Sequence, residues 1–441
     1  MQHDLTQGPI TKKILLFALP LICGNLLQQM YNIADTWVVG RFLGADALAA
    51  VGSSYTLMTF LTSILLGLCM GSGAAISMQY GSRQEARMRR SVFQSFALIG
   101  GLTLALNVAV YFGLDGIIWL LRVPQEVVPL MREYLGIIFL GISATFLYNY
   151  FANLLRAVGN SVVPLVFLAV SSVLNVVLDL LCVLVLGWGV KGAAAATVFS
   201  QYVAGIGIGA YALVCAPQLC PKREDCRWDR QNLAVILNLS LMTSVQQSIM
   251  NFGILMVQGL VNSFGTVVMA AFAAAVKIDS FAYMPVQDFG NAFSTYVAQN
   301  YGAGKTDRIR KGVRSAAAVS TLFSILISAL VWWFAAPLMG IFIDPSQGEI
   351  IAAGVQYLRI EGAFYVGIGI LFLLYGYYRA VNRPMMSVIL TIASLGTRVA
   401  LAYLLSATPL GVTGIWMSVP IGWALADAIG IGYYLRRCSA A

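Results

Sequence analysis

The chain has 441 residues, of which 59% are hydrophobic and 10% charged, half or less of the charge that a soluble chain carries. This composition excludes a soluble globular domain and predicts an all-α integral membrane protein. The net charge of +9 could suggest a nucleic-acid partner. However, the basic residues lie between apolar runs instead of on a soluble domain, so no nucleic acid is expected to bind.

Twelve apolar runs are each long enough to cross a hydrocarbon core of about 30 Å as an α-helix. The first run follows Lys12 and Lys13 and is too long for the core of a signal peptide, so we expect it to remain as the first membrane span. The runs cover residues 13–39, 47–79, 91–113, 130–155, 162–186, 191–214, 233–261, 267–299, 314–336, 352–378, 386–406 and 411–434.

The connections between these runs differ in charge, which predicts their orientation. One alternate set of connections holds twenty lysine and arginine residues, whereas the other holds three, Arg41, Arg122 and Lys191. Basic connections stay on the cytoplasmic side of a membrane. We therefore expect both termini to be cytoplasmic.

An internal repeat divides the spans into two sets of six. Tyr80-Gly81 recurs as Tyr301-Gly302 at a shift of 221, and Arg156-Ala157-Val158 recurs as Arg379-Ala380-Val381 at a shift of 223. Each half has an even number of spans, so the halves are parallel repeats related by a pseudo-two-fold axis along the membrane normal. We predict three segments: an N-terminal six-helix lobe (1–216), a cytoplasmic inter-lobe loop (217–231) and a C-terminal six-helix lobe (232–441).

The first and seventh spans each carry a polar stripe. In the first span the stripe consists of Asn25, Gln28, Asn32 and Asp35, whose helical spacing places them on one face. The seventh span has a similar row that includes Gln247 and Asn251. Polar residues also join membrane helices to one another. Two striped repeat partners nevertheless favour a substrate cavity between the lobes, near the midplane, with alternating access.

Asp35 places a carboxylate in a run that is otherwise apolar. Such a group costs roughly 2.5–3.5 kcal/mol on insertion scales and by default faces an ion or substrate pathway; the alternative is an Asp at a helix end or near the headgroups. At 1.5 Å per residue, a later hairpin brings two pairs to the same outer-half depth, Asn175 with Asp179 and Ala193 with Thr197. Two carboxylates at close range share a proton or a cation. We therefore predict a cation site for H+ or Na+, with Asp35 and Asp179 as the ligands of Na+; a hydrogen bond of Asp179 within its own hairpin is the alternative.

The second half lacks a copy of this carboxylate pair. At shifts of 221 and 222, Asp35 corresponds to Met256 and Asp179 to Leu401. The pair is therefore not required by the fold of one lobe, and no equivalent site is expected in the C-terminal lobe. Methionine suits pockets that accept varied apolar shapes, so Met256 is a candidate substrate-binding residue.

The eighth span carries its own polar group around Pro285. Lys277 and Asp288 are eleven residues apart and share one face of an ideal helix unless Pro285 turns it. With Tyr283 and Gln287 they complete the candidate substrate-binding residues. A structural ion pair between Lys277 and Asp288 is the alternative.

Motifs for metal or nucleophilic chemistry do not occur in the sequence. His3 is the only histidine, and the seven cysteines form no CxxC pair. Three of them near one loop, Cys215, Cys220 and Cys226, fit no zinc template. We therefore expect no cofactor and no enzyme activity, which weighs against the alternative of a lipid-modifying membrane enzyme.

Taken with six plus six spans, several motifs resemble those of the multidrug and toxic compound extrusion (MATE) family. They are Asn32-x-x-Asp35-x-x-x-Val39-Gly40-Arg41, Asn175-x-x-x-Asp179, Ala193-x-x-x-Thr197, the run from Lys277 to Pro285, and the run from Gln299 to Gly304. The resemblance implies a secondary-active antiporter that exports amphipathic, often cationic compounds in exchange for H+ or Na+. It also implies an N-lobe cation site, to which it assigns Asp35, Asn175, Asp179 and Thr197.

The resemblance further favours one branch of the family. Another branch uses an acidic residue on the seventh span, where this chain has Gln246 and Gln247, so the chain is similar to the bacterial DinF-like exporters. We expect a monomer in the bacterial inner membrane, with the lipid bilayer and amphipathic small molecules as partners. A flippase for a lipid-linked precursor is the alternative, but it would need a cationic lumen, whereas these stripes are neutral with two acids.

Overall fold

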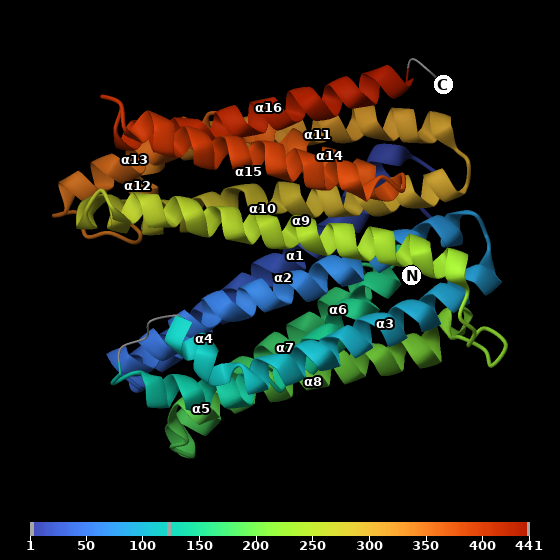
Figure 1. Ribbon diagram of the computed structural model, residues 1–441, viewed down its shortest axis with the longest axis horizontal. Helices are drawn as coiled ribbons and strands as arrows, with labels where there is room; N and C mark the ends of the chain where they lie inside the picture. Colours follow the sequence, from blue (N-terminus) through green and yellow to red (C-terminus); the bar gives the residue numbers. More distant parts are fainter. Residues whose placement is uncertain (1–3, 121–124, 439–441) are drawn as a thin grey trace. The chain divides into compact units, whose positions relative to one another are not determined.

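The computed structural model describes residues 4–120 and 125–438, and the regular elements of these two ranges are helices (Figure 1). His3 and Arg122 lie outside the described residues. The long helices are α1 (Ile10–Phe42), α2 (Ala45–Gly81), α3 (Glu85–Phe112), α7 (Val162–Leu180), α8 (Gly189–Cys215), α9 (Arg230–Asn262), α10 (Thr266–Gly302), α11 (Thr306–Trp333), α15 (Pro384–Ser406) and α16 (Val412–Cys438). A π-helix, η1 (Leu181–Val185), continues α7.

Two further spans are each broken into two helices. The fourth span consists of α5 (Val128–Ile138) and α6 (Gly141–Ala157), bent by 43°, and the tenth of α13 (Gly348–Gly362) and α14 (Tyr365–Ala380), bent by 52°. Counted as one span each, they bring the described chain to twelve candidate spans, which confirms the number predicted from hydropathy. Three short helices lie between spans: α4 (Leu114–Leu120), η2 (Pro217–Leu219) and α12 (Ala335–Met339).

Each break arises where the hydrogen bonds tighten from the α to the 3₁₀ pattern. The amide of Leu140 donates to the Ile137 carbonyl at 3.0 Å, and the amide of Phe364 donates to the Glu361 carbonyl, also at 3.0 Å. Such a change of hydrogen-bond ladder is a common cause of a sharp kink. The apolar pattern continues through both breaks, so periodicity alone did not predict them.

The chain forms two compact units. Unit 1 consists mainly of Cys23–Ser244, and unit 2 of Leu5–Ile22 with Val245–Ala441. These bounds differ from the predicted lobes, because the first half of α1 belongs to unit 2 and the first half of α9 belongs to unit 1. The two divisions, Ile22–Cys23 and Ser244–Val245, are 222 residues apart, within the range of shifts that relates the two repeats.

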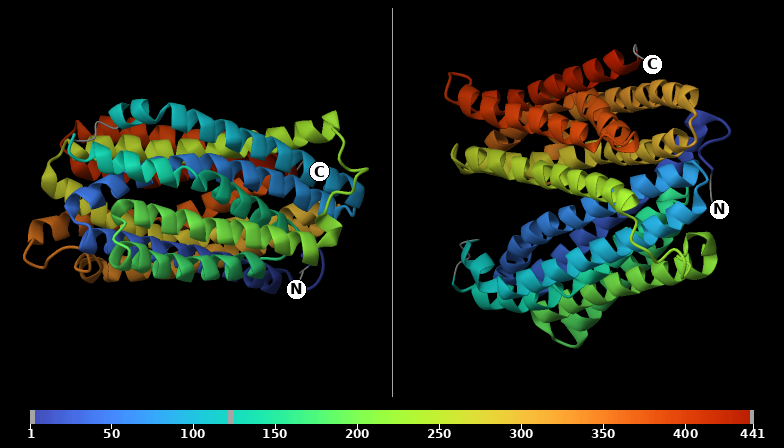
Figure 2. Two further views of the ribbon diagram at one scale, coloured as in Figure 1. Left: turned by 90° about the horizontal axis from the view of Figure 1, so that it is seen from below. Right: turned by 45° about the vertical axis from the view of Figure 1, so that its right-hand side comes forward.

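Unit 1 is held together by close helix crossings. Its α8 lies beside α6 and α7 in the views of Figures 1 and 2. Where α2 meets the first half of α9, a side chain at Gly67 or Gly71 would collide with the main chain of α9 around Thr243–Ser244 or Leu239–Ser240. Small residues at such crossings let helices approach closely in a membrane. The first half of α9 is therefore packed tightly into unit 1.

Unit 2 is built around buried aromatic rings. The rings of Phe272 and Trp416 stack with their centres 5.4 Å apart, and Tyr357 meets Trp416 edge-on at 5.0 Å. All three side chains are at most 1% exposed. This cluster joins α10, α13 and α16 beside the bend of the tenth span.

Candidate functional site

The candidate site in unit 1 starts from Asp35, in the second half of α1. Asp35 Oδ1 is buried and accepts no hydrogen bond from the described residues. One turn further along α1, Val38 and Val39 are at most 2% exposed. The carboxylate is thus held beside the core of unit 1, as its place in an apolar span requires.

The second carboxylate, Asp179, lies near the end of α7. It is fully buried, and Asn175, one turn earlier, is 2% exposed. The helix widens directly after Asp179 into the π-helix η1, in which the Leu186 amide donates to the Leu181 carbonyl at 2.9 Å. Single π turns recur at functional sites because they re-aim side chains within a helix.

The structure places the carboxyl groups of Asp35 and Asp179 within hydrogen-bonding reach of each other. Both oxygens of Asp179 and Oδ1 of Asp35 are buried and accept no hydrogen bond from the described residues. An ionised carboxylate can only accept. Two such groups in contact therefore require a proton or a metal cation between them, because bare like charges repel at this range.

Neutral oxygen ligands complete the site. Asn175 donates Nδ2 to Thr197 Oγ1 at 3.3 Å, which leaves Asn175 Oδ1 buried and without a donor among the described residues. Thr197 in turn donates to the Ala193 carbonyl at 3.0 Å. The five residues that the sequence singled out thus come together from α1, α7 and α8. Oxygen acceptors of this kind suit a hard cation such as Na+ as well as a proton.

Sequence reasoning missed one neighbour of the pair, Tyr134 on α5. Its side chain is 7% exposed and its hydroxyl interacts electrostatically with both Asp35 and Asp179. A signal was present in the repeat, where Tyr134-Leu135 recurs as Tyr357-Leu358.

Unit 2 has a different pair of buried acids, which the sequence analysis did not find. Asp279 on α10 accepts from the Tyr365 hydroxyl at 2.6 Å and from the Tyr357 hydroxyl at 3.4 Å. The carboxyl group of Glu361, 1% exposed on α13, lies within hydrogen-bonding reach of Asp279, and Arg398 on α15 acts on both.

The unit 2 pair is not a repeat copy of Asp35 and Asp179, because the positions that match these two residues in the repeat are uncharged. The acids come from helices that do not correspond to α1 and α7. The two pairs also differ in their surroundings. The unit 2 pair has tyrosine donors and an arginine, whereas three oxygens of the unit 1 pair, both of Asp179 and Oδ1 of Asp35, accept no hydrogen bond from the described residues. Unit 1 therefore holds the better candidate for an exchangeable cation.

The predicted substrate-binding residues divide between the units. In unit 1, Asn32 donates to Gln29 Oε1 at 3.4 Å, while Asn25 and Gln28 lie on the same helix. In unit 2, Asn251 donates to the Gln247 carbonyl at 3.1 Å. Met256 is 41% exposed, as a residue that faces lipid or a cavity would be. The role of these residues in substrate binding stays a prediction.

On α10, the candidate residues Lys277 and Asp288 differ in exposure. Lys277 is exposed and its Nζ lies 5.9 Å from the centre of the Phe342 ring, whereas Asp288 is 3% exposed. The two side chains differ in exposure, and their sharing one face of the helix stays a prediction. Pro285 lies within the helix between them and interrupts the regular ladder. Beside it, Tyr283 packs its ring 6.2 Å from that of Phe372, and Gln287 is half-buried.

Known proteins resemble this chain over its whole length. The family model MatE matches residues 20–181 and 240–404. The chain belongs to this family. It is 31% identical over 436 residues to YpnP, a probable multidrug resistance protein of Bacillus subtilis (strain 168), with 98% of this chain and 96% of the relative covered. A protein of Shewanella oneidensis named FAD transporter is 23% identical over 443 residues, covering 99% and 96%.

Solved structures of the family share the fold. A MATE protein crystallised in complex with MaL6 has a TM-score of 0.93 to this chain at 25% identity, with 99% of this chain and 98% of that one covered. The chain is therefore a multi-pass membrane transporter of the MATE multidrug efflux family.

Proposed function

We propose that this MATE transporter exports amphipathic, cationic compounds in exchange for one H+ or Na+, and that Asp35 and Asp179 hold this ion. One observation carries the proposal: the carboxyl groups of Asp35 and Asp179 lie within hydrogen-bonding reach of each other, and both oxygens of Asp179 and Oδ1 of Asp35 are buried without a donor from the described residues. A bound cation removes the repulsion between them, and its loss restores it. Binding of the cation to Asp35 and Asp179 therefore lowers the free energy of unit 1, and its release raises it.

In the proposed cycle the cation and the exported compound compete for α1. A compound bound along the stripe of Asn25, Gln28 and Asn32 leaves the carboxyl pair empty in the outward-open state. A cation from outside then binds Asp35 and Asp179, displaces the compound and favours the return to the inward-open state. Exchange follows because each ligand stabilises a different state.

The membrane potential contributes when the exported compound is uncharged or zwitterionic. One positive charge that moves inward across 100 mV then supplies about 2.3 kcal/mol. For a monovalent cationic compound the exchange is electroneutral, and the ion gradient alone drives export. The two kinds of substrate therefore respond differently to the membrane potential.

The distribution of charge supports the location that we propose, the bacterial inner membrane with both termini cytoplasmic. Twenty basic residues lie in one set of connections and three in the other. The lipid bilayer and amphipathic small molecules are the proposed partners of a monomeric transporter. The Shewanella relative named FAD transporter makes a flavin nucleotide the natural comparison substrate. The negative phosphates of a flavin nucleotide suit the neutral and acidic stripes of this chain less well than a cationic compound does.

Reconstituted vesicles test the proposal. Purified protein is reconstituted with a cationic dye inside, and either a Na+ gradient or a pH gradient is imposed without a membrane potential. We expect one of the two gradients to accelerate dye efflux and FAD to compete weakly. Efflux that neither gradient changes would contradict cation exchange, and strong competition by FAD would contradict the proposed substrate class.

A further inference from the structure

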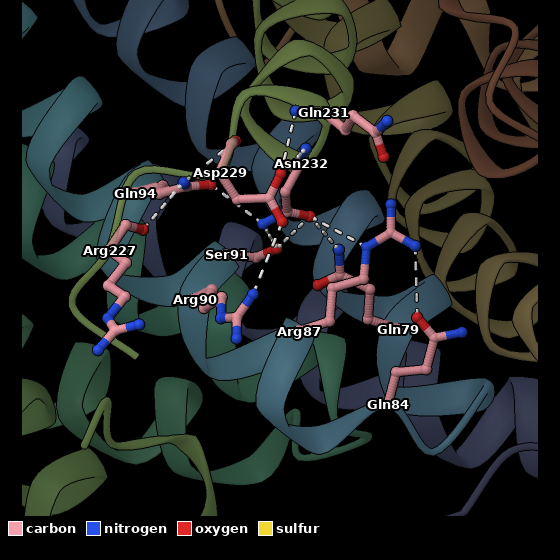
Figure 3. A network of polar contacts seen from close by, with 10 residues as sticks. All are labelled: Gln79, Gln84, Arg87, Arg90, Ser91, Gln94, Arg227, Asp229, Gln231 and Asn232. Atoms are coloured by element: carbon pink, nitrogen blue, oxygen red, sulfur yellow. Dashed lines mark hydrogen bonds and ion pairs between the residues drawn. The ribbon is translucent and has the colours of Figure 1, made fainter. Parts of the chain in front are cut away.

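Two polar clusters join the first halves of α1 and α9 to the rest of their units. In unit 1 the cluster is centred on Asn232, near the start of α9, and we call it the Asn232 clasp (Figure 3). In unit 2 the cluster is centred on the segment Leu5–Thr11, and we call it the N-terminal clasp. Neither cluster includes a residue of the carboxyl pair, and neither is required by the proposed cation site.

In the Asn232 clasp, both the oxygen and the nitrogen of the buried Asn232 side-chain amide form hydrogen bonds. The Oδ1 atom of Asn232 accepts from Gln79 Nε2 at 2.8 Å, from Ser91 Oγ at 3.1 Å and from Arg87 Nε at 3.4 Å. Its Nδ2 donates to Ser91 Oγ at 2.8 Å and to Gln94 Oε1 at 3.0 Å. Asn232, Ser91 and Gln94 are fully buried. An opened clasp would therefore leave several buried polar groups without partners.

The segment before α9 is fastened to the same helix, α3. Gln94 donates Nε2 to the Arg227 and Asp229 carbonyls, both at 3.2 Å. Arg89 donates Nε to Asp225 Oδ2 at 2.6 Å, an ion pair whose carboxylate is 4% exposed. These contacts hold the end of the inter-lobe connection, from Asp225 to Asp229, against α3 of unit 1.

The N-terminal clasp fastens the chain before α1 to unit 2 by its main chain. The Leu5 amide donates to Gln299 Oε1 at 3.1 Å, and the Leu5 carbonyl accepts from Asn300 Nδ2 at 3.2 Å and from Arg308 at 3.3 Å. Lys305 Nζ donates to the Thr6 carbonyl at 2.9 Å. The Leu5 side chain is fully buried.

The two clasps are copies of each other within the repeat. At a shift of 221, Gln79 corresponds to Asn300, Arg87 to Arg308, Gln94 to Ser315, and Thr11 to Asn232. The hydrogen bond from Asn232 to Gln94 has its counterpart in Thr11 Oγ1 and Ser315 Oγ, 2.6 Å apart. Even the turns match, with φ of 56° at Arg83 and 68° at Gly304.

The division of the chain gives these clasps a consequence. The first half of α1 belongs to unit 2 up to Ile22, and the first half of α9 belongs to unit 1 up to Ser244. Each half is also packed by apolar side chains: Ile14 and Phe17 are 1% exposed, and Ile236 and Leu239 are fully buried. The first half of each repeat's first helix is therefore bound to the unit that contains most of the other repeat.

We propose that both clasps stay closed throughout the transport cycle, so that the first halves of α1 and α9 move as fixed parts of units 2 and 1. Movement within these helices is then confined to where each changes unit, at Ile22–Cys23 and Ser244–Val245. The second half of α1, with Asp35, moves with unit 1. This proposal rests on the proposed transport function only in its second and third tests.

The first test needs no transport. The pair Thr11→Cys with Ser315→Cys is made in a chain whose seven native cysteines are replaced, with each single variant as a control. The hydroxyls are close enough for their sulfur replacements to form a disulfide. We expect the cross-link to form to the same extent with and without a cationic dye, under low and high pH or Na+. A yield that falls when dye or cation is added shows that the clasp opens and overturns the proposal.

The second test measures dye efflux from vesicles before and after oxidation of the same pair. We expect the cross-linked protein to transport within about two-fold of the reduced protein. A loss of tenfold or more that dithiothreitol reverses would overturn the proposal. If the reduced protein and wild type both fail to respond to either gradient, the proposed function fails, whereas the yield of the first test still reports on the clasp.

A third test breaks the other clasp. Asn232→Ala removes the buried amide, and we expect dye efflux to fall at least tenfold while dye binding stays within about two-fold. Gln84→Ala is the matched control, since Gln84 Oε1 accepts from Arg87 at 3.4 Å on the exposed rim of the same cluster. Folded Asn232→Ala protein with wild-type efflux would overturn the proposal. If the variant does not fold, the cross-linking tests decide.

Discussion

The substitution Asp35→Asn separates cation exchange from folding. In wild type, Asp35 and Asp179 lie within hydrogen-bonding reach of each other, and both oxygens of Asp179 and Oδ1 of Asp35 accept no hydrogen bond from the described residues. The amide of an asparagine at position 35 can donate to the Asp179 carboxylate, so the variant supplies the hydrogen that the pair lacks. We therefore expect Asp35→Asn to insert and fold, with a stability gain of about 0.5–1.5 kcal/mol, the usual worth of one hydrogen bond.

The magnitude of the transport effect follows from the number of carboxyl pairs that lack a counter-charge. One such pair holds one cation, so a monovalent dye should exchange one for one, and each tenfold cation gradient, about 1.4 kcal/mol, should support a tenfold dye gradient. A plot of the logarithm of the dye ratio against that of the cation ratio should have a slope near one for wild type. For Asp35→Asn the slope should be near zero.

The assay is steady-state dye distribution in vesicles at a series of imposed cation gradients. Asp46→Asn serves as the control, because Asp46 is an exposed carboxylate in the first turn of α2. We expect that control to keep the wild-type slope. A slope of one for folded Asp35→Asn would refute the reasoning, since dye would then be driven by a cation bound elsewhere.

Three further predictions concern the surroundings of the two acid pairs and the inter-lobe connection. Thr197→Val removes an oxygen from the cation site and should raise the half-maximal cation concentration for dye efflux about five-fold, the equivalent of roughly 1 kcal/mol, whereas Thr197→Ser should not. Tyr365→Phe removes the 2.6 Å hydrogen bond to Asp279 and should lower the free energy of unfolding by about 1.5–3 kcal/mol. The cation dependence of dye efflux should stay unchanged. A changed slope of the dye ratio against the cation ratio would contradict this. Burial raises the pKa of Asp225, but its hydrogen bond from Arg89 outweighs this and holds the pKa below 3.8. The ion pair should therefore stabilise the fold above pH 3.8 and lose this effect as the pH falls through the lowered pKa, so Asp225→Asn should melt earlier than wild type at pH 7 and together with it in strong acid.

Hydropathy and charge predicted the number of spans because each span must by itself be long and apolar enough to cross the hydrocarbon core as a helix. The repeat was visible because its motifs lie at helix ends and turns. The bends after Ile138 and Gly362 were not predicted. They depend on which backbone carbonyl accepts the hydrogen bond from a given amide, and this leaves the apolar pattern of the sequence unchanged. The membership of the first halves of α1 and α9 was also hidden, because it depends on packing between distant segments.

The unit 1 pair could be predicted because depth along a helix is simple arithmetic. A rise of 1.5 Å per residue placed Asp179 level with Thr197 in the outer half of their hairpin, and Asp35, five residues inside Gly40, lies in the same half. Glu361 was missed for the opposite reason. Its partners Asp279 and Arg398 are on other helices, and neither the repeat nor any local spacing links the three.

The most direct test of the account is the exchange of dye for cation on the purified protein at equilibrium. Protein in weakly buffered detergent solution is titrated with dye while the release of H+ and of Na+ is recorded. The account predicts one cation released per dye bound by wild type, and none by the Asp35→Asn, Asp179→Asn double variant. Dye binding by wild type without cation release, or equal release by the double variant, would contradict the claim that this carboxyl pair holds the coupling ion.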